Sequence, residues 1–220
     1  MAAAKSNTNW FAIGVSIAVV VVLVAIGGLV VFLNNQATAP GAAPKSDIIN
    51  EETGAITFGD GKDEVDTFVD FMCPICGDFE KQYGEQLQAA AADGTITLNI
   101  HPISILDRYS AGGEYSSRSA GAMYCVAAEE PNAALDYFNL LFANQPQEGT
   151  TGLTDDQLAD LAKQAGAESA ASCIADGTYA KYARDQAVSH EIKGTPTVEV
   201  NGKRLNLQAG EITVMEKLLG

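Results

Sequence analysis

Two cysteines three positions apart are the residues of this chain best suited to chemistry. Cys73 and Cys76 enclose Pro74 and Ile75, and they directly follow an apolar run. This spacing puts both thiols in the first turn of a predicted helix, where they can close into a disulfide with little backbone movement. The positive end of that helix favours a thiolate at Cys73. The pair therefore predicts reversible thiol–disulfide chemistry.

A second motif, Gly194-Thr195-Pro196-Thr197, lies about 120 residues downstream and leads into a predicted strand. X-Pro bonds are the ones that adopt the cis form in folded proteins. A Thr-Pro before a strand is a position where folds with thiol–disulfide chemistry keep a cis bond, so we expect one at Pro196. Such a loop would offer main-chain groups to an extended substrate segment. The alternative is an ordinary trans proline at the start of a strand.

Two other interpretations of the Cys73–Cys76 pair are a purely structural disulfide and half of a zinc site. A zinc site needs two more ligands, and no second closely spaced pair of Cys or His residues is present in the sequence. We therefore expect no metal and no other cofactor.

The four cysteines all lie beyond the long uncharged stretch near the N-terminus, which fits an oxidising compartment. Four cysteines allow three pairings, and Cys73–Cys76 with Cys125–Cys173 is the natural one. A Cys125–Cys173 disulfide would close a loop of about 49 residues and stabilise the fold by about 4 kcal/mol. The alternative is that Cys125 and Cys173 are buried free thiols.

The N-terminal region contains a long uncharged stretch from Trp10 to Leu33. As a helix it would span about 36 Å, enough to cross a bilayer core of about 30 Å. Lys5 before the stretch predicts a cytoplasmic N-terminus and an extracytoplasmic catalytic domain, in a single-pass protein of the cell membrane. The alternative is a cleaved signal peptide with a site at residues 37–39, but Pro40 follows that site directly and the stretch is long for a signal. A lipoprotein would need a cysteine that is absent there.

The charge distribution excludes one class of partner. With Lys5 set aside, the chain holds 12 Lys and Arg against 28 Asp and Glu, a net charge of −16. A phosphate backbone would be repelled, so nucleic-acid binding is not expected. The acidic surface is explained by solubility.

The rest of the pattern predicts an α/β fold. Strands are expected over 65–71 and 95–100, parallel to each other through a right-handed crossover that carries the cysteine helix. A helical region of about 80 residues follows, and then a strand hairpin that turns at Asn201-Gly202. A short amphipathic helix ends the chain. Residues 34–47 are rich in small and polar residues and predict a flexible tether. The helices are expected at about 113–129, 131–144, 154–165, 168–175, 178–190 and 211–219.

These features together resemble the DsbA family of exported thiol–disulfide oxidoreductases, in particular its membrane-anchored members of Gram-positive type. The resemblance covers about residues 55–220 and is carried by residues 68–76, 194–197 and 200–202. It implies a thioredoxin fold with an inserted helical subdomain, preceded by a transmembrane helix. The implied parts are a cytoplasmic N-terminus (1–9), an anchor (10–33), a linker (34–54), a first thioredoxin part with the active site (55–105), the helical subdomain (106–191) and a second thioredoxin part (192–220).

The resemblance also implies roles for residues. Cys73 would be the exposed nucleophile, Cys76 its buried partner, and Thr195–Pro196 the loop that faces the disulfide. The activity implied is donation of the Cys73–Cys76 disulfide to reduced exported proteins. The alternatives are an extracytoplasmic reductase or isomerase on the same scaffold, and a membrane-tethered binding module without activity. The anchor suggests an integral membrane quinone-linked oxidase as the partner that restores the disulfide.

Two positions differ from the common pattern of that family. Ile75 occupies a position that is often histidine, so stabilisation of the thiolate would rest on the helix dipole and backbone amides. Thr67 occupies a position that is often a buried carboxylate, and strand alternation predicts that Asp66 and Asp70 lie on the face opposite Thr67. His101, at the end of the second strand, is a candidate for proton transfer, the alternative being a simple strand-end histidine.

Overall fold

The computed structural model describes residues 10–38 and 40–220, which form two units that divide after Pro40. The first unit contains the helix α1, Trp10–Thr38, five residues longer at its C-terminal end than the predicted span. Its segment Ile13–Val31 has a mean hydropathy of 2.9 and is long and apolar enough to cross a membrane. Lys5, on which the predicted orientation depends, and Ala39 of the alternative cleavage site lie outside the described residues.

The second unit is built on one five-stranded sheet in the order β1-β3-β2-β4-β5. At its centre β2 pairs parallel with β3, as predicted, with Asp63 opposite Ile96 and Val69 opposite Pro102. The other neighbours are antiparallel, and β4 pairs with β2 from Val65↔Val200 to Phe68↔Thr197. The strands are β1 Ile56–Phe58, β2 Asp63–Val69, β3 Ile96–Pro102, β4 Thr197–Val200 and β5 Lys203–Arg204.

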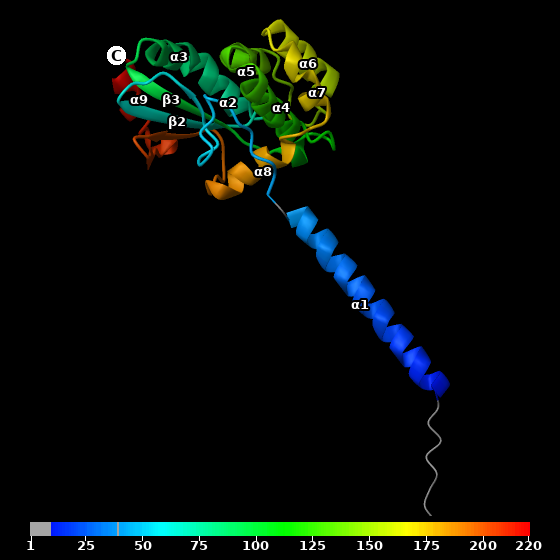
Figure 1. Cartoon of the computed structure of the whole chain (residues 1–220). Helices are drawn as coiled ribbons and strands as arrows, with labels where there is room; N and C mark the ends of the chain where they lie inside the picture. The colour runs from blue at the N-terminus through cyan, green and yellow to red at the C-terminus, as the bar shows by residue number, and fades with distance from the viewer. Residues whose placement is uncertain (1–9, 39) are drawn as a thin grey trace, which may run out of the picture. The chain divides into compact units, whose positions relative to one another are not determined.

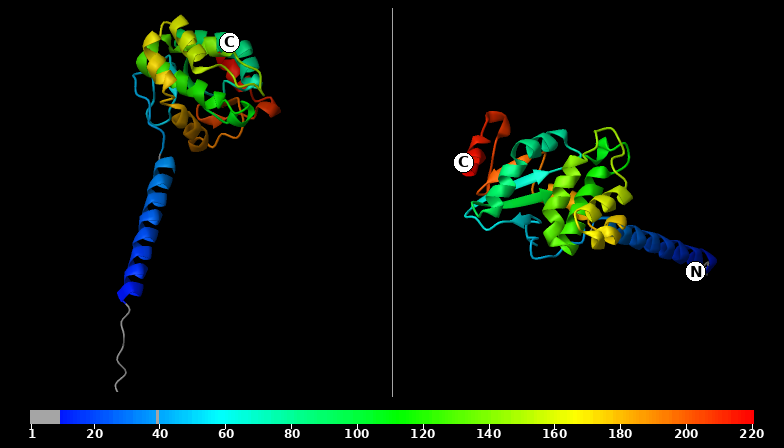
Figure 2. Two further views of the ribbon diagram at one scale, coloured as in Figure 1. Left: turned by 90° about the vertical axis from the view of Figure 1, so that its right-hand side faces the viewer. Right: turned by 90° about the horizontal axis from the view of Figure 1, so that it is seen from above.

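The helix that follows β2 is wound in three parts, α2 (Pro74–Phe79), a π-helical turn (Glu80–Gly84) and α3 (Glu85–Ala92). Figure 1 shows α2 and α3 on one side of the sheet and α8 on the other. In Figures 1 and 2, α4 to α7 gather at one end of the sheet and α9 lies at the opposite end. The helices after β3 are α4 Tyr115–Glu129, α5 Ala134–Ala143, α6 Asp155–Gln164, α7 Ala171–Ala175, α8 Ala180–Ser189 and, after β5, α9 Thr213–Leu219. Short 3₁₀ turns cover Asp107–Tyr109, Pro131–Ala133, Glu168–Ala170 and Leu207–Ala209.

Local sequence signals explain two of the element boundaries. Thr154 and Gln157 form a reciprocal capping box at the start of α6, with hydrogen bonds of 3.2 and 2.9 Å. Asn201 and Gly202 both have positive φ, 51° and 74°, which is the backbone that a two-residue hairpin between β4 and β5 requires. The strand order, together with the helices α4 to α8 between β3 and β4, confirms the predicted α/β thioredoxin fold with inserted helices.

The prediction of an unpacked tether over residues 34–47 is wrong. Residues up to Thr38 belong to α1, and from Gly41 onward the chain packs on the second unit. The Gly41 N–H donates to the Asp185 carboxylate at 2.8 Å, and Pro44 is buried. Composition predicted flexibility here because small residues bury little area, but this segment lies directly against the backbone of α8.

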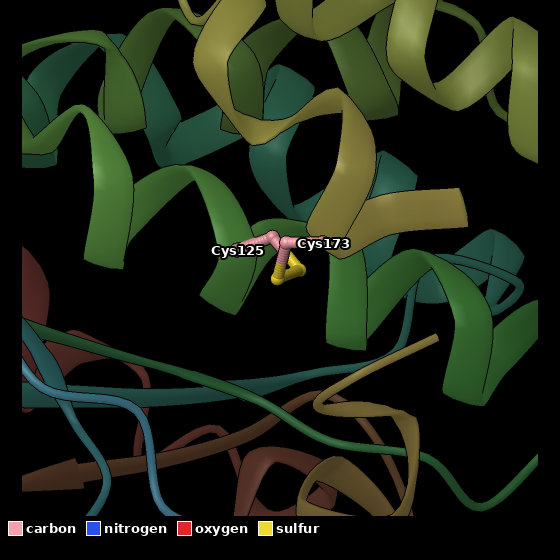
Figure 3. The surroundings of a disulfide bond; sticks show 2 residues. All are labelled: Cys125 and Cys173. Carbon is pink, nitrogen blue, oxygen red and sulfur yellow. A yellow bond between two sulfur atoms is a disulfide. The ribbon is translucent and has the colours of Figure 1, made fainter. Parts of the chain in front are cut away.

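A disulfide joins two helices of the insertion. Cys125 on α4 and Cys173 on α7 are bonded, with their Cα atoms 5.7 Å apart (Figure 3). Cys125 lies in the apolar core that α4 shares with the sheet, and Cys173 packs against that core. The bond therefore ties the short helix α7 to the main core.

We expect replacement of both Cys125 and Cys173 by alanine to lower the free energy of unfolding by about 4 kcal/mol. The reason is that the disulfide closes a loop between residues 48 positions apart, and loop closure restricts the unfolded chain. Urea denaturation of the wild type and the double variant measures the difference. A loss below about 1 kcal/mol would contradict a structural role, and an unchanged reaction rate at Cys73 is the control for an intact active site.

Candidate active site

The two cysteines of the pair lie where β2 ends and α2 begins. Cys73 is the residue that caps the N-terminus of α2, and Pro74 occupies the first helical position, where its missing N–H costs nothing. The Cys73 N–H donates to the Asp70 carbonyl at 2.9 Å, which closes the turn between strand and helix. Both thiols are free; Cys73 is 5% exposed and Cys76 is completely buried.

The surroundings of Cys73 favour its thiolate. The hydrogen bond with the Cys76 side chain lowers the pKa of Cys73 to about 6 against the effect of burial, with help from the Thr195 side chain and the N–H groups of Cys76 and Ile75. Because these two N–H groups belong to the first turn of α2, the helix N-terminus supplies part of the stabilisation. Ile75 itself points outward and is 65% exposed.

Cys76 has the opposite character. Burial raises the pKa of Cys76 well above 9, and the neighbouring Cys73 raises it further. At neutral pH the pair therefore holds one proton on Cys76 and a negative charge on Cys73. A thiol whose pKa is lowered in this way has the properties of a nucleophile and of a good leaving group.

The Thr195–Pro196 loop lies against Cys73. The peptide bond between Thr195 and Pro196 is cis, and the Cys73 Sγ lies 3.3 Å from the Thr195 carbonyl oxygen, to which it donates while the thiol is protonated. Pairing of β4 with β2, which brings Thr197 opposite Phe68, holds this loop beside the cysteine turn. The Thr195 hydroxyl is buried and has no nitrogen or oxygen partner in the described part of the chain, so it is available to donate a hydrogen bond to a sulfur.

Two grooves flank the cysteine turn and the loop. One has a volume of about 620 Å³, is lined by Cys73, and has a wall formed by Ile105 and Leu106. The other has a volume of about 820 Å³ and runs along Pro196 toward the 3₁₀ turn that begins at Leu207. Extended polypeptide on either side of a reacting sulfur could occupy them.

His101 makes no contact with the dithiol in the described residues. Its Nε2 lies 2.9 Å from the Asp66 carboxylate, and its ring stacks on Phe68 with centroids 4.1 Å apart. The ring of His190 packs edge-on against it. Burial lowers the pKa of His101, although Asp66 opposes this. His101 thus forms a small cluster of rings with Phe68 and His190, away from the dithiol. The structure therefore offers no support for a proton-transfer role.

Two residues that hold the cysteine turn were not predicted to do so. Asp70 lies just beyond the last residue of β2 and is completely buried. Gln145, which follows α5, donates from Nε2 to the carbonyl oxygens of Cys73 at 2.8 Å and Phe71 at 3.2 Å. The long-range contacts made by Gln145 leave no periodic signal in the sequence.

A third missed residue is Glu80 in the π-helical turn. Its side chain is largely buried, lines a small cavity together with Thr67, and borders an open groove of about 550 Å³ between the cysteine helix and α5. No hydrogen bond or ion pair is made by its carboxylate within the described ranges. Burial raises the pKa of Glu80 to about 8. A buried carboxylate is thus present near Thr67, but the helix supplies it rather than the strand.

The comparisons with known proteins agree with this geometry. Residues 52–215 match the model of a thioredoxin family, so the chain belongs to the thioredoxin family. The oxidised DsbA of Mycobacterium tuberculosis is similar in structure, with a TM-score of 0.67 and 29% identity over 76% of this chain and 93% of that one. The reduced disulfide bond oxidoreductase DsbG of the same organism has a TM-score of 0.63 and 30% identity over 82% and 91%. Fold and dithiol site are those of a thiol–disulfide oxidoreductase.

A sequence relative of another kind was also found. The serine/threonine-protein kinase PknE of Mycobacterium tuberculosis is 34% identical over 156 residues, which are 66% of this chain and 28% of that protein. The chain thus spans less than a third of this relative.

The buried carboxyl of Glu80 predicts a pH-dependent stability. Between pH 5 and 8 Glu80 is ionised in the unfolded chain but protonated in the fold, where its pKa is about 8. The free energy of unfolding should therefore fall as pH rises, by up to about 1.4 kcal/mol per pH unit. Glu80→Gln should remove this slope, as urea denaturation at pH 5, 6, 7 and 8 would show. Glu85→Gln, at an exposed position of the same groove, is the matched control, and parallel slopes for all three proteins would contradict the assignment.

Proposed function

We propose that the protein is an oxidase that donates the Cys73–Cys76 disulfide to reduced exported proteins. The observation that carries this proposal is the difference between the two thiols, a pKa of about 6 at Cys73 against a raised pKa at Cys76. A thiolate that is stable after release makes the disulfide a stronger oxidant, because the reduced form is favoured. A reductase or an isomerase would need a Cys73 thiolate that is less stable than the one found here.

The reaction follows from the geometry in two exchanges. A substrate thiolate attacks the Cys73 sulfur of the disulfide; the Cys73–Cys76 bond breaks, and Cys76 leaves and takes up a proton. A second substrate thiolate then attacks the substrate sulfur of the mixed disulfide, and Cys73 leaves as the stabilised thiolate. Two electrons pass from the substrate dithiol to the protein. The main chain at Thr195 and the two grooves would hold the substrate segment extended during both steps.

Single cysteine variants test this activity. With reduced ribonuclease as substrate, the oxidised protein should form substrate disulfides stoichiometrically. Cys73→Ser and Cys76→Ser should each abolish the reaction, because neither variant can hold the Cys73–Cys76 disulfide. Given oxidised glutathione instead, the Cys73 thiolate of Cys76→Ser should attack that disulfide, release one glutathione thiolate and stay in a mixed disulfide, because the Cys76 thiol that would displace it is missing. The double variant without Cys125 and Cys173 is the control. Equilibration with glutathione decides the direction: a potential near the roughly −270 mV of thioredoxin, with fast reduction of insulin, would make the protein a reductase.

We further propose that α1 anchors the protein in the cell membrane as a single span, with the catalytic unit outside the cytoplasm and a quinone-linked membrane oxidase restoring the disulfide. The length and hydropathy of Ile13–Val31 support the anchor. The Cys125–Cys173 disulfide supports an oxidising location.

Deletion of residues 1–40 should release the protein from membranes without changing its reaction with reduced ribonuclease in vitro. In cells the deleted form should accumulate with Cys73 and Cys76 reduced, because it is no longer held near the membrane oxidase. Thiol trapping followed by gel-shift analysis measures the redox state. If the dithiol of the full-length protein stays oxidised after every quinone-linked membrane oxidase is removed, the assignment of the partner is wrong. If the mature protein begins after residue 39, the N-terminal helix is a cleaved signal peptide and not an anchor.

A further inference from the structure

Asp70 is a buried carboxylate that the thiol exchange itself does not use. It follows β2 directly and is completely buried. Its Oδ1 accepts hydrogen bonds from the Met72 N–H at 2.9 Å and the Ser116 hydroxyl at 2.8 Å. Its Oδ2 accepts from the N–H groups of Ile105 at 2.9 Å and Leu106 at 3.1 Å. Each carboxylate oxygen therefore accepts two hydrogen bonds.

These four donors belong to three different segments. Met72 is the residue before the nucleophilic cysteine, and Ile105 and Leu106 form the wall of the groove that Cys73 lines. Ser116 lies in the first turn of α4, the central helix of the insertion. One carboxylate thus joins the cysteine turn, the groove wall and the helical insertion.

The main chain of Asp70 also contacts the cysteine pair. Its carbonyl oxygen accepts the Cys73 N–H at 2.9 Å. Its N–H faces the Cys76 sulfur and partly opposes the rise in the pKa of Cys76. The side chain fixes the same residue whose backbone holds both cysteines, so a movement of the carboxylate would move the sulfurs relative to the amides of α2.

We propose that Asp70 is a positioning residue for the disulfide exchange, which holds the Cys73 turn against the first turn of α2 and fixes the groove wall beside it. This inference rests on the proposed function, because it concerns how the same dithiol and groove receive a substrate. Burial raises the pKa of Asp70 above its ordinary range, with the four donors opposing, so the position is costly to keep as a carboxylate. A cost of that kind is expected where geometry is needed for the reaction.

The variant Asp70→Asn tests the cysteine turn separately from the groove wall. An amide has one acceptor oxygen, and its NH₂ group can face the Ser116 hydroxyl, which also accepts, but not the Met72 N–H. The variant should therefore keep the bonds to Ile105 and Leu106 and lose the bond to Met72. The loosened turn should raise the pH midpoint of Cys73 alkylation from about 6 by about one unit, so that the thiolate fraction at pH 6 falls about fivefold.

The experiment uses the full-length reduced protein in detergent, with iodoacetamide as the probe and thiolate absorbance as a second readout. A higher midpoint supports positioning. A lower midpoint would overturn the proposal, because removal of a nearby negative charge lowers the pKa of a thiol and would mean that Asp70 acts through its charge. An unchanged midpoint in a folded variant would also overturn it, since Asp70 would then serve stability alone. Asp107→Asn is the matched control, because Asp107 binds the Ser117 N–H of α4 but no residue of the cysteine turn.

Asp70→Ala tests the groove wall. Loss of all four bonds should slow the reaction of the oxidised protein with a cysteine-containing peptide about tenfold more than its reaction with dithiothreitol, which needs no groove. Equal slowing with both reagents would overturn this part. A wild-type protein that oxidises dithiothreitol but not the peptide would instead contradict the proposed function. If Asp70→Ala does not fold, the Asp70→Asn midpoint still decides the proposal.

Discussion

A thiolate at Cys73 depends on donors that reach its sulfur while the neighbouring thiol keeps its proton. Those donors are the Cys76 side chain, the Thr195 side chain and the first N–H groups of α2. They converge only if the helix begins at Pro74 and the chain enters it through one particular turn. The same turn buries Cys76 completely, and this burial keeps Cys76 protonated. The division of charge between two identical side chains is therefore a consequence of where one helix starts.

That starting point is fixed from three directions by segments distant in sequence. Asp70 closes the turn from the strand side, Gln145 binds the carbonyl oxygen of Cys73 from the end of α5, and Thr195 lies against the sulfur from the loop before β4. Gln145 belongs to the inserted helices, whose α4 and α7 are joined by the Cys125–Cys173 disulfide. The insertion is thus part of the support of the active site as well as a cover for the end of the sheet.

Short sequence patterns predict much of the fold and of the dithiol site. The cysteine spacing, the Thr-Pro before a strand, the Asn201-Gly202 turn and the parallel pairing of β2 with β3 all follow from patterns of a few residues. The role of Asp70 was not predicted because three of its carboxylate's four partners, Ile105, Leu106 and Ser116, lie on segments distant in sequence. Glu80 was missed because a glutamate on a helix is ordinarily solvated, and its burial depends on the packing of the π-helical turn against the sheet and α5. The packing of residues 41–54 depends likewise on a tertiary contact, with α8.

The charge around the site differs from that of the whole chain, and this difference bears on substrate range. Apart from Lys5 the chain carries a net charge of −16, yet the groove beside Cys73 holds Arg108 and Lys193 against Glu148. Screening limits the field of distant carboxylates to about 8 Å at physiological ionic strength, so a bound segment is exposed mainly to these nearby groups. The acidic surface then keeps the protein soluble without making the groove repel acidic substrates. The groove beside Cys73 is thus much closer to electrical neutrality than the chain as a whole.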